Sequence, residues 1–229
     1  MLSSLRDECM KTTGDVGSEV SDSKEYWEQY YLERRKPFPP SLFSRYVAER
    51  YLRSGDSLIE LGCGNGRDAV FFAEQGVSVT AMDQCENEIR FLAKTYGNDN
   101  LRFKCGDFTA QDDSVQYNHI YSRFTIHTIS EDRQTSVLRW ASQVVKIGGF
   151  FFLEFRGKKN ELFRKGAPVP DEPDAYFYEG HYRRFIDPEH LSRQLEQAQF
   201  EVCECVEAAG FSPFAGTDET FARVIARKA

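Results

Sequence analysis

The sequence lacks the signals that would place a chain in a membrane, in a disulfide framework or on nucleic acid. No stretch approaches about 18 apolar residues and residues 1–10 have no signal-peptide core, so a soluble, cytoplasmic protein without integral membrane association is expected. The six cysteines form no CxxC pair, so we expect buried apolar thiols and no metal site. With a net charge of -7, no nucleic-acid partner is expected.

What is present favours one compact domain. The 229 residues are 41% hydrophobic and 14% aromatic, enough for a sizeable core. Residues 1–22 are polar without periodicity and are expected to be loosely ordered, and 23–229 to form a single domain. Residues 23–40 contain Tyr26 and Tyr30, and their aromatic rings fit either a helix packed on the core or a lid over a ligand. Residues 156–186 have no clear periodicity and are expected to be a substrate-side insertion.

Elsewhere, apolar runs alternate with helical patterns. Helices are expected near 42–53, 67–75, 86–96, 131–146 and 187–199, and strands near 58–61, 77–82, 101–105, 119–124, 150–155, 200–207 and 220–227. This alternation predicts an α/β, doubly wound, mostly parallel sheet with right-handed crossovers. The last two strands are joined by a short link, which favours an antiparallel pair.

A glycine turn follows the first strand and is typical of nucleotide-binding turns. Its spacing, Gly62-x-Gly64-x-Gly66, differs from the GxGxxG of dinucleotide sites. Glu60 stands two residues before the turn, where a carboxylate repels a pyrophosphate but suits an ammonium and a sulfonium. Asp83 ends the second strand, 21 residues after Gly62, where it can accept two ribose hydroxyls.

A third acidic residue follows the third strand. Asp107 is placed to accept from an adenine amino group, with Phe108 beside the ring. Acidic residues at three successive strand ends, with the glycine turn, favour S-adenosylmethionine over a dinucleotide, although unrelated capping carboxylates are the alternative.

The segment Glu60–Gly66 resembles the first motif of class I S-adenosylmethionine-dependent methyltransferases, and Asp83 and Gly106-Asp107-Phe108 match the family's ribose and adenine positions. The resemblance, over about residues 40–229, implies a Rossmann-like seven-stranded sheet of order 3-2-1-4-5-7-6 with an antiparallel C-terminal strand. It implies a cofactor site of eight residues: Glu60, Gly62, Gly64, Asp83, Gln84, Asp107, Phe108 and Ser122. The chain departs from the family at the fourth strand, where Tyr117-Asn118-His119 replaces a common acidic residue, so the chemistry there cannot be copied.

A narrower resemblance concerns the acceptor. Tyr26-Trp27, Ser122-Arg123-Phe124-x-x-His127 and His181–Phe185 are similar to the methyltransferase part of enzymes that modify bacterial surface polysaccharides, including O-antigen. This implies polysaccharide modification by methylation.

Basic side chains beyond the strand ends predict a small polar, anionic acceptor, such as a phosphorylated or acidic sugar or a glycan end. The candidate substrate-binding residues are Tyr26, Tyr30, Arg156, Tyr182, Arg183 and Arg184. The alternative is that nearby carboxylates, such as Asp174 and Glu179, neutralise these arginines in salt bridges.

His127, His181 and Arg123 are the candidate catalytic residues, with either histidine as a general base for a hydroxyl acceptor. The alternative for His127 is a histidine hydrogen-bonded beside the core. Other functions that stay open are a methyltransferase for another small molecule (amine, thiol or metalloid), an NAD-dependent oxidoreductase and a non-catalytic binding module. The oligomeric state is also open.

Overall fold

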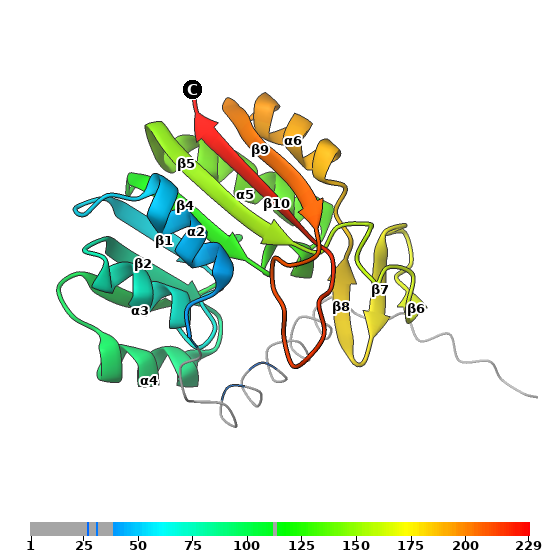
Figure 1. Cartoon of the computed structure of the whole chain (residues 1–229), viewed down its shortest axis with the longest axis horizontal. Helices are drawn as coiled ribbons and strands as arrows, with labels where there is room; N and C mark the ends of the chain where they lie inside the picture. Colours follow the sequence, from blue (N-terminus) through cyan, green and yellow to red (C-terminus); the bar gives the residue numbers. More distant parts are fainter. Residues whose placement is uncertain (1–26, 28–30, 32–38, 112–113) are drawn as a thin grey trace, which may run out of the picture.

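The computed structural model describes residues 27, 31, 39–111 and 114–229 (Figure 1). The helices are α2 (Leu42–Tyr51), α3 (Arg67–Glu74), α4 (Glu86–Tyr96), α5 (Glu131–Val144) and α6 (Pro188–Gln197), with a 3-10 turn η1 (Ile126–Thr128). The strands are β1 (Ser57–Leu61), β2 (Ser78–Asp83), β3 (Leu101–Cys105), β4 (Tyr117–Arg123), β5 (Val145–Phe155), β6 (Ala167–Pro168), β7 (Ala175–Tyr178), β8 (His181–Arg184), β9 (Phe200–Ala208) and β10 (Phe221–Lys228).

The main sheet has the predicted order. It runs β3-β2-β1-β4-β5-β10-β9, and β10 is antiparallel to both of its neighbours. The pairs among β1 to β5 are parallel. The prediction of a doubly wound, mostly parallel sheet is therefore confirmed, and β9 and β10 are its sixth and seventh strands. In such a sheet the loops after β1, β2, β4 and β5 reach the same edge.

Local sequence explains where the helices begin. Ser41 and Ser130 cap α2 and α5, since their hydroxyls accept from the amides of Ser44 and Arg133. Asp187 caps α6, and Pro188 occupies its first turn, where no amide donor is needed. The helix predicted over 131–146 ends at Val144, because the chain enters β5 at once.

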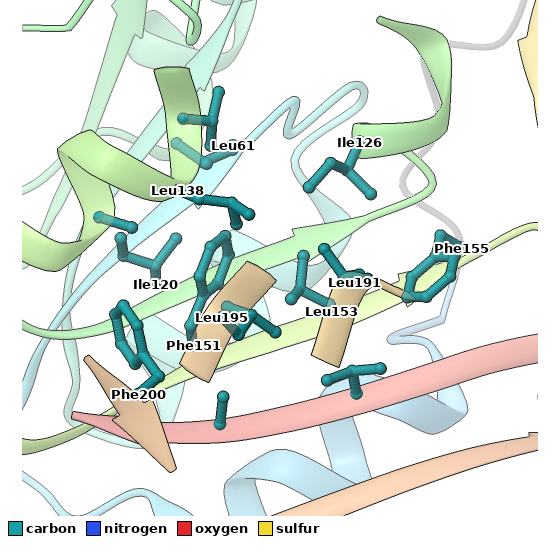
Figure 2. Packing of buried hydrophobic residues seen from close by; sticks show 14 of the residues in the cluster. Leu61, Ile120, Ile126, Leu138, Phe151, Leu153, Phe155, Leu191, Leu195 and Phe200 are labelled. Atoms are coloured by element: carbon teal, nitrogen blue, oxygen red, sulfur yellow. The ribbon is translucent and has the colours of Figure 1, made fainter. Parts of the chain in front are cut away.

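Two apolar layers cover the two faces of the sheet. On one face, Phe43 of α2 and Phe72 of α3 are fully buried against β1, β2 and β4. On the other face, α5 and α6 pack over β1, β4, β5 and β10, and Figure 2 shows Leu138 and Leu195 beside Phe151 and Leu191 beside Leu153. Burial on both faces explains the continuous apolar run in β5.

The structure differs from the sequence expectation in the insertion. Residues 156–186 contain a second sheet, in which β6, β7 and β8 pair antiparallel, set apart from the main sheet (Figure 1). Because these strands are short and prolines interrupt the segment, the sequence does not show the alternation of apolar and polar residues that is typical of a strand.

The cysteines also differ from expectation. Cys63 and Cys85 are buried as predicted, but Cys105, Cys203 and Cys205 are exposed. Cys203 and Cys205 lie on β9, the edge strand of the main sheet. Cys9 lies outside the described residues.

The two layers predict a contrast between two apolar positions of β5. Phe151→Ala should lower the free energy of unfolding by about 3–5 kcal/mol, because the fully buried ring leaves a cavity. Ile147→Ala, at a side chain that is 86% exposed, should change it by less than about 0.5 kcal/mol. Urea titration of both variants measures the difference, and equal losses would contradict this packing.

Candidate active site

The glycine turn after β1 has a backbone that no other residue fits. Gly62, Gly64 and Gly66 have φ of 71°, 53° and 73°, the left-handed region. A Cβ on Gly62 would lie 2.5 Å from the Thr125 side chain, and one on Gly64 would lie 2.5 Å from the Tyr31 hydroxyl. The side chains of Thr125 and Tyr31 therefore pack directly against the backbone of the turn, and a larger residue at either glycine would displace them.

Asp83, at the end of β2, holds the turn. One carboxylate oxygen accepts from the backbone N–H of Gly64 at 3.0 Å, and the other accepts from that of Cys85 at 3.0 Å. Each carboxylate oxygen has a second lone-pair site, so both oxygens can also accept a hydroxyl. Asp83 lines a cavity at the sheet edge.

Glu60 has an unusual environment for a carboxylate. It is only 4% exposed, lines the same cavity, and its Oε2 atom has no hydrogen-bond partner in the structure. Burial, followed by the nearby Asp68 carboxylate, raises the pKa of Glu60 well above its usual value. A buried acceptor that lacks a donor, facing a cavity, is the feature expected of a group that binds a cationic ligand.

Asp68, in the first turn of α3, was not among the predicted site residues. It accepts from the backbone N–H and hydroxyl of Ser41, both at 2.8 Å, from Ser44 Oγ at 2.8 Å and from Tyr121 Oη at 3.0 Å. This network joins α2, α3 and β4 beside the glycine turn. The sequence signal that could have identified Asp68 as a site residue is its position directly after Gly66-Arg67, at the start of the helix that follows the glycine turn.

The cavity encloses about 580 Å³ and has two parts. The first lies over the strand ends and includes Glu60, Gly62, Cys63, Gly64, Asn65, Arg67, Asp68, Asp83, Gln84 and Phe108. The second, which we call the acceptor side, includes Trp27, Tyr31, Arg123, Phe124, Arg156, Ser212, Pro213, Phe214, Thr217, Glu219 and Phe221.

Aromatic rings from distant segments meet at the acceptor side. Trp27 stacks on Tyr31 with ring centroids 5.8 Å apart and contacts the ring of His181 at 5.7 Å. Tyr26 and Tyr30, predicted to bind substrate, lie outside the described residues.

Both arginines that line the acceptor side have acidic partners. Arg123 pairs with the buried Glu154 at 2.8 Å. Arg156 pairs with Glu219 and donates to Asn160 Oδ1 at 2.8 Å. These two arginines are therefore paired in salt bridges, as the alternative expected. Their partners are Glu154 and Glu219 rather than Asp174 or Glu179. Glu219 and the loop before it were missed because they lie far away in the sequence.

Several predicted residues do not line the cavity. Ser122 and His127 are buried behind its wall, which corrects the expectation that they face the reaction centre. His127 Nδ1 faces the backbone N–H of Arg156 at 3.4 Å. Burial, with a smaller effect of nearby arginines, lowers the pKa of His127 well below its usual range, so the ring is neutral.

The cluster near residue 183 is likewise directed into the protein or along the small sheet rather than into the cavity. Arg184 is buried and donates to the Ile129 carbonyl at 3.0 Å. Arg183 donates to the Tyr178 carbonyl at 2.6 Å, and the Tyr182 hydroxyl donates to Glu172. These three side chains are not on the cavity wall that the described residues form, and their contact with substrate stays a prediction.

Asp107 differs from its neighbour Phe108. Phe108 lines the cavity, whereas the Asp107 carboxylate pairs with Arg133 and accepts from the Thr109 backbone N–H at 2.8 Å. The adenine role of Asp107 stays a prediction.

Comparison with known proteins identifies the family. A family model described as a methyltransferase domain matches residues 31–205. The chain belongs to this methyltransferase-domain family. A relative from Haemophilus influenzae, a probable S-adenosyl-L-methionine-dependent methyltransferase TehB, is 28% identical over 95 residues, 41% of this chain and 33% of the relative. The chain thus matches about a third of that relative's length.

Solved structures show the same fold. A 1,6-didemethyltoxoflavin-N1-methyltransferase from Burkholderia thailandensis, with S-adenosylhomocysteine bound, has a TM-score of 0.70 at 18% identity, covering 96% of this chain and 93% of that chain. TehB from Haemophilus influenzae has a TM-score of 0.65 at 20% identity, covering 89% and 67%. The predicted cofactor, S-adenosylmethionine, is thereby confirmed for this methyltransferase, whereas the polysaccharide resemblance stays a prediction.

In the described part of the chain, no helix is long and apolar enough to cross a membrane. Among the same residues, no group of three or more His, Cys, Asp or Glu side chains could hold a metal ion.

The burial of Glu60 predicts a pH-dependent stability in the cofactor-free protein. Because its pKa is raised from 4.5 on folding, the ionised carboxylate destabilises the native state, and stability falls as the pH rises above about 4.5. Glu60→Gln should therefore raise the melting temperature at pH 7.5, and the gain should vanish at or below about pH 4.5.

Thermal unfolding at the two pH values measures this effect. The matched control is Glu74→Gln, at an exposed position of α3, which should change neither value. A lower melting temperature for Glu60→Gln at pH 7.5 would contradict the inferred environment.

Proposed function

We propose that this chain transfers the methyl group of S-adenosylmethionine to a small polar, anionic acceptor. The observation that carries the proposal is Glu60, which lines the cavity beside the glycine turn and whose buried Oε2 atom has no hydrogen-bond partner among the described residues. The ammonium group of S-adenosylmethionine supplies the missing donor. A dinucleotide would instead place its pyrophosphate near Glu60 and Asp68, where two carboxylates repel it.

The remaining cofactor roles follow from the position of each residue on the cavity wall. Gly62 and Gly64 line the cavity on the side proposed for the methionine portion, and Asp83 has acceptor capacity for the ribose hydroxyls. Phe108 and Gln84 line the wall on the side proposed for adenine, with Asp107 next in sequence.

The charge distribution supports different ligands in the two parts. Around the cofactor part, three carboxylates (Glu60, Asp68 and Asp83) face one cation, Arg67, which matches the net positive charge of S-adenosylmethionine. On the acceptor side, Arg123 and Arg156 line the cavity, and each is paired with one carboxylate, Glu154 or Glu219. Each guanidinium group has further N–H donors beyond that pair, which favours an anionic acceptor.

The chemistry requires little beyond alignment. The acceptor oxygen attacks the methyl carbon in line with the carbon–sulfur bond, the new bond forms as that bond breaks, and the sulfonium becomes a neutral thioether. An oxyanion has no proton to lose in this step. This agrees with a cavity whose described wall contains no histidine, and it makes a direct base role for His127 or His181 unnecessary.

The acceptor class remains the one inferred from the sequence, a phosphorylated or acidic sugar or a glycan end, with polysaccharide modification as its setting. The toxoflavin-type relative is named for a small-molecule acceptor, which is consistent with the size of the cavity. Amines, thiols and metalloid oxyanions are the competing acceptors.

Cofactor binding tests the first half of the proposal. Asp83→Asn should weaken S-adenosylhomocysteine binding at least about tenfold, since one charged acceptor for ribose is lost. Isothermal titration calorimetry measures the Kd, and Asp99→Asn, at an exposed turn, is the matched control. Tighter binding of NADH than of S-adenosylhomocysteine by the unaltered protein would favour an oxidoreductase instead.

The choice of acceptor tests the second half of the proposal, that the acceptor is a small anion. Methyl transfer from labelled S-adenosylmethionine is measured with sugar phosphates, uronic acids, primary amines, thiols and tellurite. Arg156→Met should raise KM for the acidic sugars about tenfold, because a charged hydrogen bond is lost, and change KM for amines less than about twofold. Arg193→Met, on the exposed face of α6, is the control. Preferred turnover of an amine, a thiol or tellurite would overturn the anionic-sugar assignment.

A further inference from the structure

The loop between β9 and β10, residues 209–220, has internal order of its own. Phe214 and Thr217 exchange two backbone hydrogen bonds of 2.9 Å, and the Gly210 N–H donates to Asp218 at 2.7 Å. Ser212, Phe214 and Thr217 line the acceptor side of the cavity. Figure 1 shows this loop extending from the edge of the sheet toward the site. Its position relative to the sheet therefore shapes the space for an acceptor.

A buried charge triad lies beneath this loop. Glu154 of β5 is 0% exposed, and its two oxygens accept from Arg123 Nε at 2.8 Å and from Arg223 Nε at 2.7 Å. Glu154 is the register partner of Arg123 on β4 and of Arg223 on β10, so three adjacent strands each supply one member. Glu154 thus holds both guanidinium groups in fixed orientations.

The outer end of each guanidinium holds the loop. Arg123 Nη2 donates to Ser212 Oγ at 2.6 Å. Arg223 Nη2 donates to the Phe211 carbonyl at 3.1 Å, and its Cζ lies 4.0 Å from the centroid of the Phe211 ring. Two consecutive loop residues are therefore fixed to the sheet through one carboxylate.

A contribution to the stability of the fold does not explain why this charge triad is buried. Burying three charges carries a desolvation penalty, and apolar side chains of similar volume often stabilise a protein as well or better. What apolar side chains could not supply is a pair of directed donors at the sheet edge. We therefore attribute to the triad the positioning of the loop rather than the stabilisation of the core.

We propose that the Arg123–Glu154–Arg223 triad determines acceptor specificity by fixing residues 211–214 as one wall of the acceptor side. Glu154 is a positioning residue that acts through Arg123 and Arg223, and Ser212 is the loop residue that receives the Arg123 hydrogen bond. Neither residue belongs to the cofactor part of the cavity. The effect on acceptors rests on the proposed function, whereas the anchoring of the loop does not.

Proteolysis tests the anchoring without any acceptor. Phe214 is 64% exposed at the loop tip, and chymotrypsin can cleave after it only when the loop leaves the sheet and extends. Ser212→Ala removes the hydroxyl that Arg123 holds, so the cleavage rate should rise about tenfold. Ser212→Thr keeps the hydroxyl and should restore resistance. Ser136→Ala, which removes a hydroxyl from the exposed face of α5, is the control.

Kinetics and binding then test specificity. With the best substrate of the acceptor panel, Ser212→Ala should raise KM about tenfold, while kcat and the Kd for S-adenosylhomocysteine stay within about twofold. A general loss of folding would instead weaken S-adenosylhomocysteine binding together with turnover. Glu154→Gln should release both arginines and give a larger change in KM, with the melting temperature recorded for each variant.

The outcomes separate the two proposals. An unchanged cleavage rate in Ser212→Ala would overturn the anchoring, and an unchanged KM would overturn its role in specificity. If the unaltered protein binds no S-adenosylhomocysteine and methylates nothing in the panel, the proposed function and the specificity role both fail, and the cleavage rates still decide whether the triad anchors the loop.

Discussion

The site depends on one contact, the hydrogen bond from the Gly64 backbone N–H to the Asp83 carboxylate. It ties the loop after β1 to the end of β2, and it is possible because the glycine turn adopts left-handed φ values without a Cβ. The turn in turn sets the start of α3, where Gly66 is the N-cap. Asp68 then joins that helix to α2 through Ser41. The first β–α–β unit is thus closed by carboxylates rather than by apolar packing alone.

The same arrangement explains why the two parts of the cavity differ in charge. The carboxylates of the cofactor part lie on β1, β2 and the first turn of α3, close together in sequence and fixed by backbone geometry. Those of the acceptor side, Glu154 and Glu219, are matched to arginines from other strands and loops. An anion brought near Glu60 would meet the carboxylates of the cofactor part, whereas one near Arg123 and Arg156 would meet guanidinium groups that are each paired with a carboxylate. This division suits the proposed pairing of a cationic donor with an anionic acceptor.

This difference also explains what the sequence could predict. The alternation of strands and helices and the cavity positions of Glu60, Asp83 and Phe108 follow from local patterns, because each depends on residues close to one strand end. The order of the sheet came instead from the family resemblance. The acceptor side does not follow from such patterns. His127 and Arg184 have residue types suited to catalysis and binding, and yet burial and backbone hydrogen bonds direct them elsewhere. A residue type indicates a possible chemistry, but only packing decides which way the side chain points.

The residues around the acceptor side come from distant parts of the sequence, so local patterns could not predict that they meet. Arg123 is 31 positions from Glu154 and 89 from Ser212, and Glu154 is 69 from Arg223. Arg123 and Glu154 meet through the parallel pairing of β4 with β5, and Arg223 and Ser212 join them because β10 enters the sheet antiparallel beside β5. The same reversal places the loop before β10 over the site. A substitution in that loop can therefore change the acceptor wall without altering the glycine turn, so the structural basis of acceptor choice is separate from that of cofactor binding.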